Sequence, residues 1–134
     1  MADIRLVNPP GTELVYKQYR YSQAVVSGNR IDVAGQVGVR PDHSIPNDIV
    51  EQARNAFANL KRVLEAAGSS LDHVTHLTQY LVSMSELPYV EMVFAEFFPD
   101  RYPARTVVQV SALVLPELRL EIQASARLKD PLEP

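Results

Sequence analysis

The chain has 134 residues, a formal net charge of −3 at pH 7 and no cysteine. This length suits one domain with a single hydrophobic core. The acidic balance argues against a general nucleic-acid binder, which would carry a basic face, and the lack of cysteine excludes disulfides and thiolate metal ligands. No apolar run approaches the roughly 20 residues of a spanning helix, and residues 1–10 lack a signal-peptide pattern. We therefore expect a cytoplasmic protein without a membrane partner.

The first third of the sequence predicts an arm followed by strands. Residues 1–13 are polar and rich in proline, which is typical of an extended N-terminal arm, and residues 14–19 are expected to form a short strand. Residues 21–26 and 31–39 read as two paired strands joined by a glycine-containing turn. Gly35 interrupts the second of these strands. A glycine there indicates either a local bulge or the close approach of a ligand or a neighbouring chain.

Two amphipathic helices and a strand follow. Asp48 and Glu51 have the spacing of a capping box at the start of the first helix. Apolar residues then recur at spacings of three and four as far as Gly68, a residue type that often ends helices. Residues 85–98 repeat this helical pattern. Between the two helices, residues 71–82 are predicted to form a strand.

Residues 102–126 contain two further runs of alternating apolar and polar residues, which predict a hairpin of half-buried strands around a short turn. Arg105 lies at the start of the first strand, and Glu121 lies on the polar face of the second. A guanidinium at a strand end and a carboxylate one strand away can flank a small anionic ligand. They also fit a structural ion pair at the surface or at an interface. Residues 128–134 are expected to form a flexible tail.

These elements have the order β-β-α-β-α-β-β, which predicts one α+β domain over residues 1–134, with a mixed sheet and two helices on one face. His43, His73 and His76 do not have the arrangement of a metal site, so no metal is expected. The sequence also lacks a catalytic serine–histidine–acid pattern, a phosphate loop and a dinucleotide-binding motif. What remains for chemistry is arginine, carboxylate and hydroxyl groups.

Several motifs carry a resemblance to a known family. Pro103-Ala104-Arg105-Thr106, followed by alternating apolar residues and then Leu120-Glu121-Ile122, resembles the signature of the RidA family, also called YjgF or the RutC-like deaminases. The other matching pieces are Tyr21–Ala24, Ala34–Gln36, Glu51–Arg54, Val63–Gly68 and Phe94–Phe98. The resemblance covers residues 21–127. It implies a chorismate-mutase-like fold and a homotrimer with ligand clefts between subunits.

The resemblance also implies an activity, the hydrolysis of small 2-imino acids or enamines to 2-oxo acids and ammonia without a cofactor. In the family, the residue matching Arg105 binds the substrate carboxylate and the residue matching Glu121 serves the attacking water. The residue matching Tyr21 lines the cleft from the adjacent subunit. Backbone groups near Gly35 and Val107 are expected to hold the amine. The partner implied is therefore a small-molecule carboxylate.

Two residues depart from the family pattern. Val107 stands where many members have cysteine, which is tolerable if the backbone makes the contact. Glu91 stands where archetypal members have asparagine. A carboxylate facing the cleft would repel an anionic substrate, or would select a substrate with a cationic or hydrogen-bond-donating group. Alternatively, Glu91 points to solvent from its helix.

Other functions therefore stay open beside the 2-iminobutanoate/2-iminopropanoate type of deaminase. The departures fit a divergent deaminase, such as one of the 2-aminomuconate type. A second alternative is a non-catalytic sensor that binds small carboxylates in the same cleft. Ribonuclease activity, attributed to some relatives, is disfavoured by the acidic balance and by the lack of a suitable histidine pair.

Overall fold

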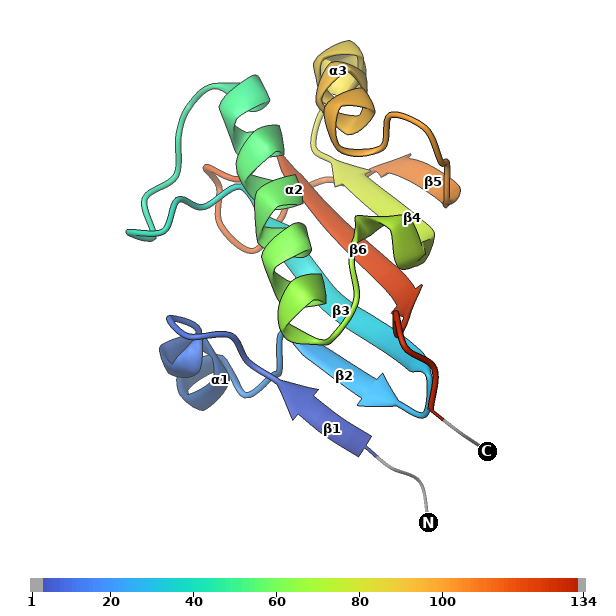
Figure 1. Ribbon diagram of the computed structural model, residues 1–134. Helices are drawn as coiled ribbons and strands as arrows, with labels where there is room; N and C mark the ends of the chain where they lie inside the picture. Colours follow the sequence, from blue (N-terminus) through green and yellow to red (C-terminus); the bar gives the residue numbers. More distant parts are fainter. Residues whose placement is uncertain (1–3, 133–134) are drawn as a thin grey trace.

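A computed structural model describes residues 4–132 of the chain and shows a six-stranded sheet with helices packed against it (Figure 1). The order of strands across the sheet is β1-β2-β3-β6-β4-β5. The strands are β1 (Ile4–Val7), β2 (Ala24–Ser27), β3 (Arg30–Val37), β4 (Val74–Leu81), β5 (Ala104–Gln109) and β6 (Leu120–Arg127). The α-helices are α1 (Glu13–Tyr19), α2 (Ile49–Ala66) and α3 (Leu87–Phe97), and two 3-10 turns span Leu71–His73 and Met84–Glu86.

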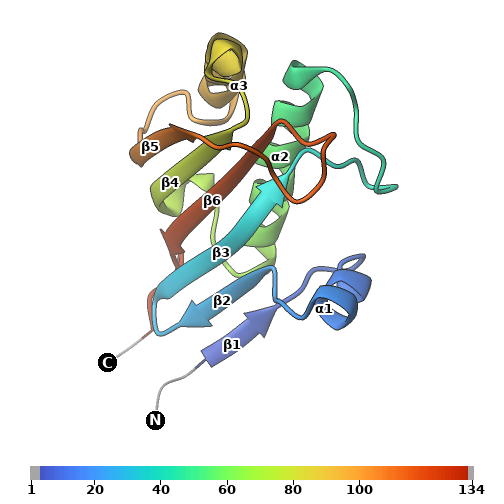
Figure 2. The same cartoon turned by 180° about the vertical axis from the view of Figure 1, so that it is seen from behind.

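The last two strands do not form the predicted hairpin. β5 pairs in parallel with β4 at the edge of the sheet, whereas β6 lies between β3 and β4 and is antiparallel to both. Residues 110–119 therefore carry the chain past the end of β4 (Figure 2). The alternating pattern identified both strands but contains no information on their partners, because pairing depends on contacts distant in sequence. The sheet is mixed, as predicted.

The N-terminal segment also differs from the prediction. Residues 4–7 of the expected arm form β1, which pairs with β2, and residues 13–19 form α1 instead of a strand. The helix ends at Arg20, which adopts a left-handed conformation with φ 61°. None of the residues of α1 is buried. An exposed helix needs no apolar stripe, so the 3.6-residue period that would have identified it is missing.

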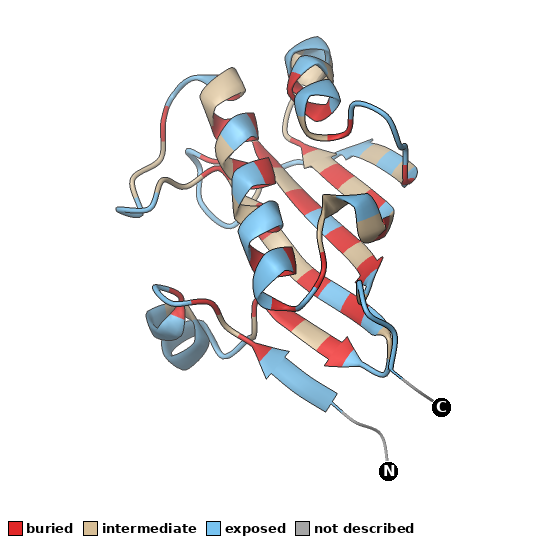
Figure 3. Ribbon diagram, viewed as in Figure 1, coloured by how far each residue is buried: buried red, intermediate tan, exposed pale blue. Residues whose placement is uncertain are grey.

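Helices α2 and α3 cover one face of the sheet, and the hydrophobic core lies between these two layers (Figures 1 and 3). The predicted cap of α2 is confirmed, since Asp48 accepts a hydrogen bond from the backbone N–H of Glu51 at 2.9 Å. Gly68 follows α2 with φ 89°, as expected for a residue that ends a helix. Along β6, buried residues alternate with exposed or half-buried ones (Figure 3). The second face of the sheet is thus polar and open in one chain.

Backbone hydrogen bonds connect residues 128–132 of the predicted tail to the rest of the domain. The backbone N–H of Leu128 donates to the carbonyl of Asn29 at 3.0 Å, and that of Lys129 donates to the carbonyl of Gly68 at 3.1 Å. The backbone N–H of Leu132 donates to the Asn29 side chain at 2.7 Å. Residues 1–3 of the expected arm and 133–134 of the expected tail lie outside the described residues. Within residues 4–132, no helix combines the length and apolarity needed to cross a membrane.

Candidate functional site

Arg105 projects from edge strand β5 toward helix α3, where several groups hold its guanidinium. Glu91 accepts two hydrogen bonds, one from Nη1 at 3.0 Å and one from Nη2. The central carbon of the guanidinium lies 3.8 Å above the ring centre of Phe94, which is a cation–π contact. The exposed fraction of the side chain is 23% for Arg105 and 43% for Glu91, so the pair is accessible from solvent.

The side chain of Gln79 binds the Nε edge of this guanidinium. Its carbonyl oxygen accepts a hydrogen bond from Nε of Arg105 at 2.7 Å. Gln79 lies on β4 between Leu77 and Leu81 and is fully buried. Within residues 4–132, its amide nitrogen is the buried side-chain polar atom without a hydrogen-bond partner. The orientation of the amide is thus set by Arg105, at the cost of an unsatisfied donor.

Glu121 lies on the opposite face of the sheet, in contact with Gly35. In the register of the sheet, Glu121 of β6 is opposite Val37 of β3 and Tyr80 of β4. A Cβ atom at Gly35 would lie 2.7 Å from the Glu121 carboxyl carbon, so glycine at this position makes room for the carboxylate. Burial raises the pKa of the Glu121 carboxyl above its ordinary value. A raised pKa makes this carboxyl a better proton acceptor in its ionised form than an exposed glutamate.

Gly35 also lines a cavity of about 770 Å³ beside α1, together with Tyr21. The cavity lies between α1, β3, the loop from β3 to α2, and residues 114–118. Its wall includes Val15, Tyr19 and Leu115 as well as the polar side chains of Gln36 and Arg62. Tyr21 is 43% exposed, so its ring is available to a ligand or a neighbouring chain.

The predicted site residues thus fall into two groups that one chain does not bring together. Arg105, Glu91 and Val107 belong to the face that packs against the helices. Glu121 and Gly35 meet on the other face, with Tyr21 farther along the same cavity as Gly35. Arg105 and Glu121 therefore do not flank a single ligand within one chain. They are separated by β4 and project from opposite faces of the sheet.

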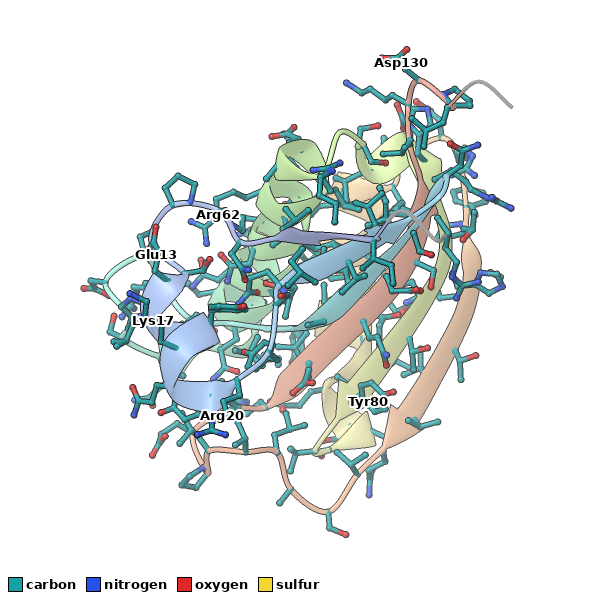
Figure 4. The ribbon with its side chains drawn as sticks, turned by 90° about the horizontal axis from the view of Figure 1, so that it is seen from below. Glu13, Lys17, Arg20, Arg62, Tyr80 and Asp130 are labelled. Atoms are coloured by element: carbon teal, nitrogen blue, oxygen red, sulfur yellow. The ribbon has the colours of Figure 1, made fainter. Side chains whose placement is uncertain are left out.

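Residues that the sequence analysis did not select also contribute to these groups. Gln79 was visible in the sequence as a polar residue between two leucines of a buried strand face, which is an uncommon position for an unpaired amide. Tyr80 lies on the open face, where its hydroxyl donates to Gln123 at 2.8 Å. Figure 4 shows Tyr80 on β4, well apart from Lys17 of α1 and from Arg20 at the end of this helix.

The three histidines lie outside both groups. Nδ1 of His73 is 2.9 Å from the hydroxyl of Ser70, and Nδ1 of His76 is 3.1 Å from that of Thr75. His43 has a positive φ of 70° in the loop that lines the cavity. Within residues 4–132, no three histidine, aspartate or glutamate side chains gather in a group that could hold a metal ion.

Comparison with known proteins assigns this fold to a family. The profile of the family described as Endoribonuclease L-PSP matches residues 13–128. The chain is 40% identical over 108 residues to a RutC family protein of Pyrococcus horikoshii, which covers 79% of this chain and 85% of the relative. The chain therefore belongs to the YjgF/RidA/RutC family.

Two further similar proteins are a named deaminase and a structure with a bound ligand. The chain is 37% identical over 108 residues to the 2-iminobutanoate/2-iminopropanoate deaminase of Mus musculus, with 79% of each chain covered. It is also similar to E. coli TdcF, whose crystal structure contains bound serine. The TM-score is 0.76 and the identity 32%, over 80% of this chain and 87% of TdcF.

Proposed function

We propose that this chain hydrolyses small 2-imino acids, and the enamines that are their tautomers, to 2-oxo acids and ammonia without a cofactor. The observation that carries the proposal is the carboxyl of Glu121, half-buried against Gly35 with its pKa raised by burial. The deaminase names of relatives that are 35% and 37% identical support the same reaction. The bound serine in TdcF supports a small amino-acid-like ligand.

The reaction needs few groups because an imine carbon is already electrophilic. A water oxygen forms a bond to this carbon and loses a proton, for which Glu121 is the proposed acceptor. The carbon–nitrogen bond then breaks as the nitrogen takes up protons, so that water and imine are converted to a carbonyl compound and ammonia. Arg105 would hold the head group next to the reacting carbon, and Tyr21 would close the cleft.

Because Arg105 and Glu121 lie on opposite faces of the sheet in one chain, we propose that the complete site forms between neighbouring copies of a homotrimer. One copy would supply Glu121, Gly35 and Tyr21, and the next would supply Arg105 and the backbone at Val107. The open polar face of the sheet supports such an assembly, because a second copy can satisfy its hydrogen-bonding groups.

A coupled assay tests the activity. An amino-acid oxidase generates 2-iminopropanoate or 2-iminobutanoate in situ, and semicarbazide traps the imine that remains. Active protein should lower the amount of trapped product, and Glu121→Gln should reduce the rate by about 100-fold or more. Ligand binding without turnover would instead indicate a carboxylate sensor.

Mixing two inactive variants tests the shared site. Arg105→Ala lacks one half of the cleft, and Glu121→Gln lacks the other half. If each site is built from two copies, random mixed trimers should recover about one quarter of the wild-type activity, because one interface in four combines both intact halves. Each variant mixed with itself is the control. A mixture that stays inactive although the subunits exchange would contradict a shared site.

A further inference from the structure

The guanidinium of Arg105 is already engaged within its own chain. The two oxygens of Glu91 accept hydrogen bonds from Nη1 and Nη2, and Gln79 accepts one from Nε. Phe94 covers one face of the group. A guanidinium carries five N–H donors, of which these contacts use three, including the parallel pair at its end.

The two remaining N–H groups of Arg105 do not form a second fork. Because the guanidinium is planar, the free hydrogen on Nη1 points back toward the aliphatic part of the Arg105 side chain. The free hydrogen on Nη2 lies beside Nε, whose own hydrogen is bonded to Gln79. A carboxylate binds arginine best through two parallel hydrogen bonds. A substrate carboxylate would therefore have to displace Glu91, and it would be repelled by the negative charge of Glu91 if it did not.

We propose that Glu91 is the specificity-determining residue of this site, and that it selects imines with an uncharged carboxamide head group over imines with a carboxylate. This inference rests on the imine hydrolysis proposed above, in which 2-imino acids are accepted but bound more weakly than the corresponding carboxamides. A carboxamide oxygen can accept a hydrogen bond from a remaining N–H of Arg105. Its NH₂ group can donate to a free lone pair of Glu91, and the Arg105–Glu91 pair stays intact. No second negative charge enters the site.

Binding of two stable product analogues tests the selection without requiring turnover. Pyruvate and pyruvamide differ only in the head group, so calorimetry with each compares carboxylate and carboxamide directly. The variants are Glu91→Gln, which keeps the size of the side chain, and Glu91→Ala, which removes its head group. Glu96→Gln is the matched control, because Glu96 lies on the same helix and pairs with Arg54 at 2.9 Å, away from Arg105.

The wild type and Glu96→Gln should bind pyruvamide about tenfold or more tightly than pyruvate, and both Glu91 variants should shift the preference toward pyruvate by a similar factor. The inference would be overturned if the ratio of the affinities for pyruvamide and pyruvate were the same in all four proteins. It would also be overturned if neither compound bound. Failure of the proposed activity looks different. In that case the affinities still shift, but neither the wild type nor Glu91→Gln hydrolyses 2-iminopropanoate in the coupled assay.

Discussion

Gln79 accepts a hydrogen bond from Nε of Arg105 at 2.7 Å, although the amide nitrogen of the same buried side chain has no partner. An unsatisfied buried donor normally costs stability. A leucine or valine would fit this strand face without that cost. The relationship indicates that Gln79 is present to orient Arg105, and that the two residues act as a unit.

We expect Arg105→Ala to lower the free energy of unfolding by about 1–3 kcal/mol, because the buried carbonyl oxygen of Gln79 loses its donor. Urea denaturation measures this change. Arg54→Ala is the control, since the Arg54–Glu96 pair is exposed and should contribute little to stability. The double variant Arg105→Ala/Gln79→Leu should recover part of the loss. If Arg105→Ala and Arg54→Ala cost the same, Gln79 does not depend on Arg105.

The raised pKa of Glu121 predicts a pH-dependent stability. The folded protein binds this proton more tightly than the unfolded chain, so the contribution of Glu121 is fully present below the unfolded pKa of about 4.3 and is lost as pH rises through the folded pKa. Relative to the wild type, Glu121→Gln should therefore gain stability as the pH rises through this range.

Glu96→Gln should respond to pH in the opposite direction. Hydrogen bonding to Arg54 lowers the pKa of Glu96, so its ionised form contributes stability above the unfolded pKa, and this contribution is lost as pH falls through the folded pKa. Denaturation of both variants and the wild type between about pH 2 and pH 8 compares the two trends, because the Glu96 contribution changes below the unfolded pKa and that of Glu121 above it. A difference between Glu121→Gln and the wild type that stays constant over this range would contradict the prediction.

Two glycine substitutions should separate activity from stability. A Cβ atom at Gly35 would meet the flexible end of the Glu121 side chain, so Gly35→Ala should displace the carboxylate and reduce imine hydrolysis with little loss of stability. A Cβ atom at Gly38 would lie 2.6 Å from the backbone oxygen of Gln52 in α2. Gly38→Ala should therefore cost about 1–3 kcal/mol. Thermal melts measure the stability of both variants, and the coupled assay measures their activity. A larger loss of stability in Gly35→Ala than in Gly38→Ala would show that Gly35 has a structural role.

Light scattering tests the proposed trimer. We expect a trimer at micromolar concentration, and we expect Thr78→Lys to weaken it, because Thr78 alternates with buried Leu77 and Gln79 and so faces the open side of the sheet. Ala58→Lys on the exposed side of α2 is the control and should leave the assembly unchanged. A stable wild-type monomer would rule out this arrangement.

Local features of the fold were predictable from sequence. The hydrogen bond of Asp48 to the N–H of Glu51 links residues three positions apart, and the alternation in β6 placed Glu121 on the polar face of its strand. Both depend on neighbours along the chain. Helix α1 was misread because none of its residues is buried and its apolar residues form no stripe.

The geometry of the candidate site was not predictable in the same way. The face on which Arg105 lies follows from the pairing of β5 with β4, and its partners Glu91 and Gln79 come from two other elements. Such contacts are set by the assembled tertiary structure and leave no periodic signal in the sequence. The prediction that Arg105 and Glu121 act one strand apart therefore failed for a single chain.

The central position of β6 has a consequence for how the protein is made. This strand is formed by residues 120–127, yet it joins the half-sheet β1-β2-β3 to the half-sheet β4-β5. Until a ribosome has released these residues, the edges of β3 and β4 lack their shared neighbour. Folding of this domain should therefore wait for residues 120–127 and be limited by long-range strand pairing.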